Sequence, residues 1–279
     1  MPDVYAMINE VDEATLDQVA QAMEISAADP QHLDMLRDYL SDLGLDKGAE
    51  APTGGEARAR VLEIGCGTGA ISRVLAGLPG VREVVGADPS AALLDRARSL
   101  SSTRSNLSFL QADGRDLPLP EADFDVVVLH RVLSHVPGPQ TLLAQAHRVL
   151  RPGGRLAVFD GDYSTITLAT GPTDPLQTCV DAFIPAYITD PWLVRRLPAL
   201  LDGAGFTHGR LRSHGFAQIE DPGYMLTIAD RGAEALVAAG RIGQALADAL
   251  KAEARRRVSD HTFFGHIAYA SLTARRATG

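Results

Sequence analysis

Apolar residues recur at helical spacing in the first part of the chain and predict two amphipathic helices. The repeats fall at Leu16, Val19, Ala20 and Met23, and again at Leu33, Leu36, Leu40 and Leu43. Between them, Asp29-Pro30 supplies an N-cap and a first-turn proline for the second helix. Residues 47–57 are rich in Gly, Ala and Pro, which indicates a linker. We therefore expect residues 1–57 to form a helical cap or lid that ends in a linker.

From Arg60 onward, short apolar runs alternate with helical patterns. The expected strands are residues 60–64, 83–87, 107–111, 124–130 and 155–160, and the expected helices are residues 71–78, 91–100 and 142–150. Pro152-Gly153-Gly154 would end the third of these helices before the fifth strand. Strands that alternate with helices are typical of a parallel sheet covered on both faces. The expected fold class is therefore α/β, with a doubly wound, mostly parallel sheet.

The pattern is less regular after Asp160. A segment of about thirty residues carries several prolines, and a helix near residues 198–204 and a strand starting at Phe206 follow it. Residues 222–258 have a helical pattern broken by Gly240, and residues 263–274 alternate like a closing strand. We therefore expect one domain over residues 58–279, with a helical insertion at about residues 221–260.

A glycine-rich turn follows the first expected strand, in the string Val61-Leu62-Glu63-Ile64-Gly65-Cys66-Gly67-Thr68-Gly69. Glycine permits the sharp turn and lets a ligand approach the backbone closely. Gly65-x-Gly67-x-x-Ala70 also satisfies the fingerprint of dinucleotide-binding enzymes. The turn by itself therefore leaves an NAD(P)-dependent oxidoreductase open.

Acidic residues near the strand ends favour a nucleoside without a pyrophosphate. Glu63 precedes the first glycine, where its charge would repel a pyrophosphate but could hydrogen-bond the loop or reach an ammonium group. Asp88 ends the second strand and could accept both ribose hydroxyls, as it could in an NAD enzyme. Asp113 follows the third strand and could accept a hydrogen bond from an adenine amine.

These motifs, followed by residues 124–130, 133–137 and 148–154, resemble in order and spacing those of class I S-adenosylmethionine-dependent methyltransferases. The resemblance is to the ubiquinone-biosynthesis-like (type 11) subgroup and is close over residues 58–160. It implies a Rossmann-like sheet of seven strands whose last strand is antiparallel, and S-adenosyl-L-methionine as cofactor. Residues 263–274 are well placed to be that last strand.

The resemblance also implies roles for individual residues. Gly65, Cys66, Gly67, Thr68 and Gly69 would wrap the methionine end, with Glu63 beside them; Asp88 would hold the ribose, Pro89 would flank the adenine, Asp113 and Gly114 would bind the adenine edge, and His130 would lie by the sulfonium. From the cap, Tyr5 or Met7 could touch the cofactor. The helices of the cap could equally serve as packing or as a dimer contact.

Two histidines are candidates for a general base, which an acceptor with an acidic proton would need. His130 and His135 are these candidates, although either could instead have a packing role. The candidate acceptor-pocket residues are Asp160, Asp162, Tyr163, Trp192 and His214. The first of these follow a strand at the carboxyl edge of the sheet, where open α/β sheets bind ligands. A simple turn at residues 160–163 is the alternative.

Composition and charge narrow the classes of partner. The net charge of -9 arises from residues 1–60, with 13 acidic and four basic side chains, and argues against nucleic acid. Two cysteines support neither a disulfide framework nor a thiolate zinc site, and no histidine pair has metal-ligand spacing, so we expect no metal. The apolar runs are too short to cross a membrane. We expect a cytoplasmic monomer or homodimer.

The function that this sequence predicts is methyl transfer from S-adenosylmethionine to oxygen, nitrogen or carbon of a small-molecule acceptor, in natural-product or cofactor biosynthesis. Three alternatives stay open at this point. One is a protein of the same fold that binds the cofactor without methylating, either cyclase-like or regulatory. The others are an NAD(P)-dependent oxidoreductase and a methyltransferase that acts on RNA or protein.

Overall fold

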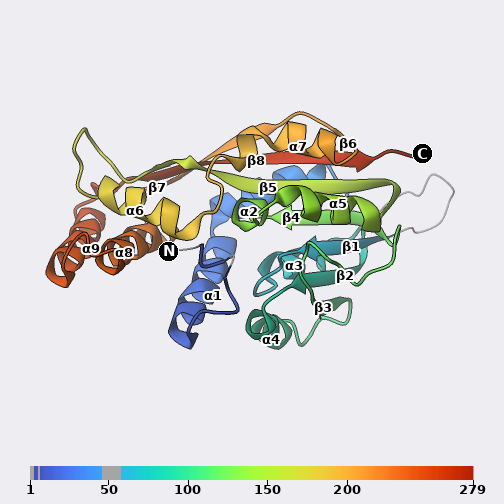
Figure 1. Ribbon diagram of the computed structural model, residues 1–279, viewed down its shortest axis with the longest axis horizontal. Helices are drawn as coiled ribbons and strands as arrows, with labels where there is room; N and C mark the ends of the chain where they lie inside the picture. Colours follow the sequence, from blue (N-terminus) through green and yellow to red (C-terminus); the bar gives the residue numbers. More distant parts are fainter. Residues whose placement is uncertain (1–2, 6, 46–57, 279) are drawn as a thin grey trace.

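A computed structural model describes residues 3–5, 7–45 and 58–278 (Figure 1). The helices are α1 (Glu13–Ala28), α2 (Pro30–Ser41), α3 (Ala70–Leu75), α4 (Ala91–Leu100), α5 (Pro139–Val149), α6 (Gln177–Tyr187), α7 (Leu197–Gly203), α8 (Gly223–Ala238) and α9 (Gln244–Ser259), with 3-10 turns at Leu133–His135 and Leu193–Arg195. The strands are β1 (Ala59–Ile64), β2 (Val81–Asp88), β3 (Leu107–Gln111), β4 (Phe124–His130), β5 (Leu150–Thr167), β6 (Phe206–His208), β7 (Arg212–Gln218) and β8 (Gly265–Arg276). The predicted linker, residues 47–57, lies outside the described residues.

The sheet confirms the predicted doubly wound topology. Its order is β3-β2-β1-β4-β5-β8-β6, and the first five strands are parallel. The last strand, β8, is antiparallel to β5, as predicted. The described strands number eight rather than seven, because β6 and β7 pair successively along the same side of β8. Glycine is a weak strand former, and the interruption between β6 and β7 begins at Gly209.

Alternate residues of the central strands face two apolar layers. Val126 and Val128 belong to the layer that contains α2 and α3, whereas Val127 and Leu129 face the layer that contains α5 and α7. Both sets are fully buried, which explains why these strands read as continuous apolar runs. The sheet therefore fixes the carboxyl ends of β1, β2, β3 and β4 at one edge, where the glycine turn lies.

The segment after Asp160 is more regular than its prolines predict. β5 continues to Thr167, and residues 177–187 form α6, which the sequence analysis misses. Buried residues Cys179, Val180 and Phe183 give α6 an apolar face despite Pro185. The prolines therefore obscure a helical pattern that packing preserves.

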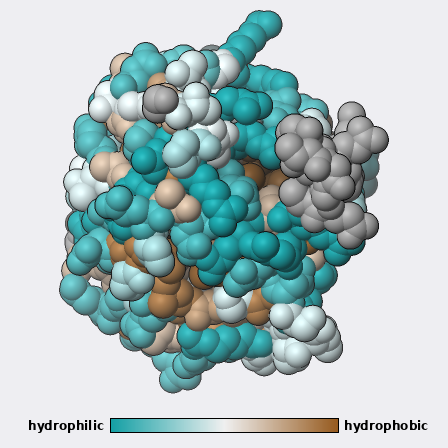
Figure 2. Space-filling model, turned by 90° about the vertical axis from the view of Figure 1, so that its right-hand side faces the viewer, coloured by the Kyte–Doolittle hydropathy of each residue, from teal (hydrophilic) through white to brown (hydrophobic). Residues whose placement is uncertain are grey.

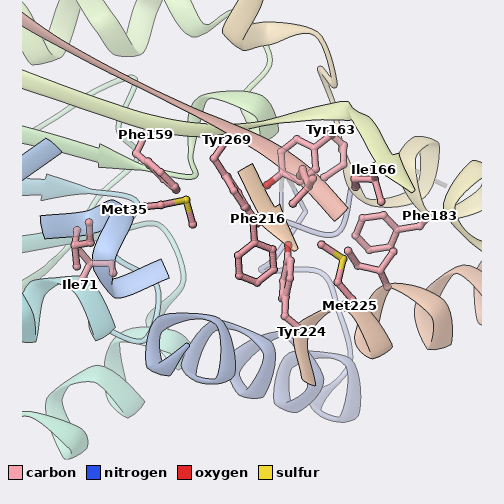
Figure 3. Close-up of a cluster of buried hydrophobic side chains, with 14 of the residues drawn as sticks. Met35, Ile71, Phe159, Tyr163, Ile166, Phe183, Phe216, Tyr224, Met225 and Tyr269 are labelled. Carbon is pink, nitrogen blue, oxygen red and sulfur yellow. The ribbon is translucent and has the colours of Figure 1, made fainter. Parts of the chain in front are cut away.

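Helices α6, α8 and α9 gather at the far ends of β5, β7 and β8, at the left of Figure 1. A buried apolar cluster joins them to the strands, with residues drawn from the sheet and from α8 (Figure 3). The backbones of α6 and α8 approach so closely that a Cβ on Gly232 would lie 2.0 Å from the Cys179 carbonyl oxygen. Helix α1 lies between this group and the glycine turn (Figure 1), in contact with both α8 and α3.

Hydrophilic residues cover most of the molecular face in Figure 2, and hydrophobic residues gather toward its lower part. Among the described residues, the helices are too short or too polar to cross a membrane.

Candidate active site

The glycine turn has the backbone geometry that its sequence predicts. Gly65, Gly67 and Gly69 have φ angles of 75°, 52° and 73°, in the left-handed region that favours glycine. A Cβ on Gly65 would lie 2.5 Å from the Val132 side chain, and one on Gly67 would lie 2.7 Å from Met23 Sδ. The turn therefore requires glycine for both conformation and space.

The end of β2 holds this turn in place. The backbone N–H groups of Gly65 and Cys66 donate to the Ala87 carbonyl at 2.7 and 3.1 Å. The Asp88 carboxylate accepts from the backbone N–H groups of Gly67 and Ser90 at 2.8 and 2.9 Å. Asp88 thus ties the turn to the start of α4, and its oxygens keep free lone pairs for further hydrogen bonds.

Two more carboxyl groups flank the turn. Glu63 is buried and accepts a hydrogen bond from the Ser72 hydroxyl. Burial raises the pKa of Glu63 to about 8, so its carboxyl group is largely protonated at neutral pH. From α1, Glu24 accepts hydrogen bonds from the Thr68 hydroxyl at 2.6 Å and from the Arg73 guanidinium at 2.7 Å. Glu24 therefore fastens α1 to the turn.

A cavity runs from the turn along the ends of β2 and β3. Asp88, Pro89, Asp113 and Gly114 line it, and its apolar walls include Ile8, Ile64, Leu93, Val132 and Leu142. Asp113 forms an ion pair with Arg115 at 2.6 Å, and the hydrogen bonds from Arg115 lower the pKa of that carboxyl. Apolar walls with carboxylates at the edges fit a nucleoside, whose base is flat and whose hydroxyls donate hydrogen bonds.

The turn is a poor site for a pyrophosphate. A helix N-terminus after a glycine turn ordinarily attracts phosphate. Here Asp88 accepts from Gly67, and Glu24 contacts Thr68, so two carboxylates already occupy the neighbourhood. Like charges at this distance repel, which favours a ligand without phosphates.

Both candidate histidines line the cavity beside the turn. His130 Nδ1 lies 2.9 Å from the Tyr39 hydroxyl, and its ring stacks on Phe159 at a centroid distance of 4.7 Å. Burial lowers the pKa of His130 well below its usual range, so the imidazole is neutral and weakly basic. His135 Nδ1 lies 2.9 Å from an Asp3 carboxylate oxygen. The carboxylate fixes the orientation of the His135 ring.

Of the five predicted acceptor-pocket residues, Tyr163 lines the cavity system, together with His135. The other four, Asp160, Asp162, Trp192 and His214, are not among the residues that line these cavities. Asp160 is fully buried and accepts from the Ser134 backbone and hydroxyl. Asp162 pairs with Arg195, Trp192 is 50% exposed, and His214 bonds Ser271 at 2.8 Å. Strand-end position alone does not determine which way these side chains point.

Several residues that line the cavity system are missed by the sequence analysis. They are Met23 and Ser26 of α1, Arg131 after β4, and Tyr224 and Arg231 of α8. Arg131 has a usable signal, since it follows His130 at the carboxyl end of a predicted strand. Tyr224 and Arg231 have none, because they lie about a hundred residues from the motifs and reach the site through tertiary packing.

Over residues 3–5, 7–45 and 58–278, no group of three or more His, Cys, Asp or Glu side chains is arranged to hold a metal ion. The two cysteines are buried and free. Burial raises the pKa of the Cys66 thiol well above its usual value, so Cys66 in the turn is not a thiolate nucleophile.

Comparison with known proteins identifies the central part of the chain. Residues 62–158 match a family described as a methyltransferase domain. A 2-phytyl-1,4-naphtoquinone methyltransferase from Synechococcus elongatus is 42% identical over 106 residues, which cover 36% of this chain and 45% of that protein. A demethylmenaquinone methyltransferase from Tropheryma whipplei is 33% identical over 144 residues, covering 52% and 56% of the two chains. The chain thus spans about half the length of these curated relatives.

The likeness of fold extends further than the likeness of sequence. The crystal structure of the 4+2 cyclase SpnF matches with a TM-score of 0.58 and 21% identity, over 100% of this chain and 99% of that one. This similarity shows that the fold includes the helices outside residues 62–158. Residues 62–158 thus match the methyltransferase domain family, in a chain whose fold is that of class I, Rossmann-like methyltransferases.

Proposed function

We propose that this protein transfers a methyl group from S-adenosyl-L-methionine to a small-molecule acceptor. The observation that carries the proposal is the glycine turn flanked by the carboxyl groups of Glu63, Asp88 and Glu24, next to a cavity suited to a nucleoside. The bound cofactor supplies a sulfonium methyl group, which an acceptor nucleophile attacks in line. The methyl donor is a nucleoside joined to an amino acid and has no phosphate, so it suits these walls.

The residues of the turn and the strand ends would hold the cofactor. Gly65 to Gly69 would wrap its amino-acid end, Asp88 would accept from the ribose hydroxyls, and Asp113 with Gly114 would meet the adenine edge. Met23 and Tyr5 line the same cavity from the N-terminal side. Together with α1 they would cover the ligand and exclude water. The cover would orient the reactants, and the exclusion of water would suppress hydrolysis.

His135 is the better of the two candidate bases. Burial makes His130 a weak base, and its Nδ1 already faces the Tyr39 hydroxyl. His135 has the arrangement expected of a general base, with a carboxylate of Asp3 holding one ring nitrogen and the other available. For an acceptor hydroxyl or acidic carbon, His135 would take the proton as the new bond forms.

We propose an aromatic acceptor related to a quinol. The curated relatives are named for methylation of naphthoquinone-type substrates. The part of the cavity system beyond the turn has aromatic walls, including Tyr5, Tyr163, Phe183 and Tyr224. Flat aromatic walls favour a flat ligand.

Calorimetry and product analysis test the proposal. We expect S-adenosylhomocysteine and S-adenosylmethionine to bind, and NAD and NADP to give no heat. With labelled cofactor and reduced naphthoquinones, demethylated cofactor and methylated acceptor should appear together. Tight binding of nicotinamide dinucleotides without binding of S-adenosylhomocysteine would refute the proposal. Cofactor binding without turnover on a broad acceptor panel would instead support a non-methylating protein of this fold.

A further inference from the structure

A chamber beyond the glycine turn lies between the sheet and the roof formed by α6 and α8. We call it the tyrosine chamber and define it by Tyr5, Arg131, His135, Tyr163 and Tyr224, which line one continuous part of the cavity system. Tyr5, Arg131 and His135 also line the cavities beside the turn, so the chamber opens toward the cofactor site. The chamber encloses about 10 Å³, room for about one water-sized group, so an oxygen of an acceptor would enter it while the rest of the acceptor lies in the cavity beside the turn.

Arg131 occupies an unusual backbone position in this chamber. It follows the last residue of β4 and has a φ of 58°, in the left-handed region that disfavours residues with side chains. Its backbone N–H donates to the Phe159 carbonyl at 2.7 Å, so the sheet fixes this conformation. Non-glycine residues held in this region cluster at functional sites. This backbone conformation directs the Arg131 side chain toward the chamber.

The Arg131 guanidinium has neutral partners. It donates to the Ser26 hydroxyl at 2.5 Å and to the Tyr224 hydroxyl at 2.8 Å, and it lies 5.1 Å from the centre of the Tyr224 ring. Arginine stays charged at neutral pH, and a cation in a partly buried site ordinarily pairs with a carboxylate. Within the described residues, none of the ion pairs includes Arg131.

The carboxyl groups near the chamber are engaged elsewhere. Asp3 accepts from Thr189 and pairs with His135, and Asp160 accepts from Ser134 and Gly161. Glu24 is paired with Arg73. Glu63 is protonated at neutral pH, as described above. The positive charge of Arg131 is therefore uncompensated by the residues around it.

A buried tyrosine hydroxyl adds a second, independent sign of a missing ligand. The Tyr163 hydroxyl has no hydrogen-bond partner among the described residues, although the side chain is 1% exposed. A buried hydroxyl without a partner is costly and calls for an explanation. Figure 3 shows Tyr163 and Tyr224 reaching from β5 and α8 toward the space between the strands and the helix. Both hydroxyls could donate to an acceptor atom placed there.

We propose that Arg131, with the Tyr163 and Tyr224 hydroxyls, binds an anionic oxygen of the methyl acceptor, either a carboxylate or a phenolate. This inference rests on the proposed function, because it places an acceptor beside the cofactor site. A guanidinium recognises anionic oxygens through directed N–H donors, and two tyrosine hydroxyls would complete the shell around them. Binding of the anionic oxygen would orient the ring of the acceptor. For a phenol, the guanidinium would also stabilise the ionised, more nucleophilic form.

The same chemistry could come from the carboxylate of the cofactor itself. The contact of Arg131 with Tyr224 favours the acceptor, because Tyr224 lines the chamber and is not among the residues that line the cavity beside the glycine turn, where the amino-acid end of the cofactor would lie. The experiment distinguishes the two sources by measuring cofactor and acceptor binding separately.

The test uses benzoate as an aromatic anion and benzamide as its uncharged counterpart, each titrated into the protein saturated with S-adenosylhomocysteine. We expect benzoate to bind and benzamide to bind at least about tenfold more weakly. Arg131→Met should weaken benzoate binding about thirtyfold and leave benzamide binding unchanged, whereas Arg131→Lys should retain part of the affinity. Tyr163→Phe should weaken benzoate binding without changing the charge. Arg37→Met, at an exposed position, is the matched control.

Each outcome bears on the proposal. Equal affinity for benzoate and benzamide, or unchanged benzoate binding in a folded Arg131→Met variant, would overturn it. A loss of S-adenosylhomocysteine affinity in Arg131→Met would assign Arg131 to the cofactor carboxylate and overturn the acceptor assignment. If Arg131→Met fails to fold, the Arg131→Lys and Tyr163→Phe titrations decide in its place. Failure of the wild-type protein to bind S-adenosylhomocysteine would refute the proposed function and is detected before benzoate is added.

Discussion

At the scale of single residues, the site combines groups whose ionisation is set by burial. Glu63 is the next-to-last residue of β1 and His130 the last residue of the neighbouring β4, and burial holds both in their neutral forms at neutral pH. The charged groups beside the turn are then Asp88, the Glu24–Arg73 ion pair and Arg131. In a site proposed to hold a cationic sulfonium next to an acidic acceptor, neutral forms of Glu63 and His130 add no charge that would interact with either ligand.

Glu63→Gln should change how stability depends on pH. The folded-state pKa of Glu63 is about 8 against an ordinary value of 4.5, so the folded protein keeps a proton that the unfolded chain releases. Stability is therefore greatest below pH 4.5 with respect to this group and is lost as pH rises to about 8. The Gln variant should lack this loss, which is on the order of 5 kcal/mol. Urea unfolding across that window measures it.

The exposed Glu220→Gln serves as the control for this measurement. An unfolding free energy of the Glu63→Gln variant that falls with pH as steeply as that of the wild type would contradict the protonated state of Glu63.

Gly67→Ala should impair both stability and cofactor binding. The left-handed φ costs a residue with a side chain about 1–2 kcal/mol, and the added methyl group would meet Met23. We expect a weaker S-adenosylhomocysteine affinity by about tenfold or more. Gly171→Ala, where an added Cβ meets nothing within 4 Å, should bind like the wild type. Calorimetry compares the two variants, and equal affinities would contradict the assigned role of the turn.

At the scale of elements, α1 connects the cofactor turn to the roof. It contacts α3 on one side and α8 on the other, and Glu24 joins it to Thr68 and Arg73. Its ion pair and hydrogen bonds to the turn are polar and partly exposed, whereas Val19, Ala20 and Ala22 of α1 are buried, so the ties to the turn cost less to break than the packing of the helix. This arrangement suits an element that covers the ligand and opens to release it.

Glu24→Ala should speed cofactor release more than it destabilises the fold. Losing a partly exposed ion pair removes about 0.5 kcal/mol, which corresponds to about a twofold faster dissociation of S-adenosylhomocysteine. Stopped-flow displacement measures the rate, and hydrogen exchange should increase within α1. Glu13→Ala, in the exposed first turn of the same helix, is the matched control. A rate unchanged from that control would argue against α1 as a cover.

Helices and strands are predicted well where burial requires a regular pattern of apolar residues, and poorly where it does not. Residues 107–111 and 124–130 are predicted with the bounds of β3 and β4, because apolar runs there end at turn residues. The strand β7 is missed, since Arg212, Ser213 and Gly215 are exposed and give no apolar alternation. The same contrast applies to the site. The residues proposed to hold the cofactor form a local motif, and Arg131 and Tyr163 follow predicted strands. Tyr224 has no such signal and joins them through tertiary packing.

At the scale of the whole molecule, the proposed sites for the cofactor and the acceptor have walls from different elements. The turn and the ends of β1, β2 and β3 surround the cofactor cavity, whereas α8 contributes the far wall of the tyrosine chamber. A change in the packing of α8 should therefore affect the acceptor far more than the cofactor.

Gly232→Ala tests this division. An added Cβ would lie 2.0 Å from the Cys179 carbonyl oxygen, so α6 and α8 must separate, at about 3 kcal/mol. We expect a lower denaturation midpoint and loss of benzoate binding, with S-adenosylhomocysteine affinity kept within about twofold. Gly243→Ala, whose added Cβ meets nothing within 4 Å, should match the wild type. Equal losses of both ligands would show that the two walls are not independent.

The strand β5 extends from Leu150 to Thr167. It carries Phe159, which stacks on His130, and Tyr163, which lines the chamber. Four residues along an extended strand span about 13 Å, and pairing with β8 holds β5 in place from Arg155 to Asp162, the residue before Tyr163. Replacement of side chains on α8 would thus reshape the pocket without moving the reacting partners apart. Directed evolution toward new acceptors should accordingly find its productive changes on the helix and leave the strand untouched.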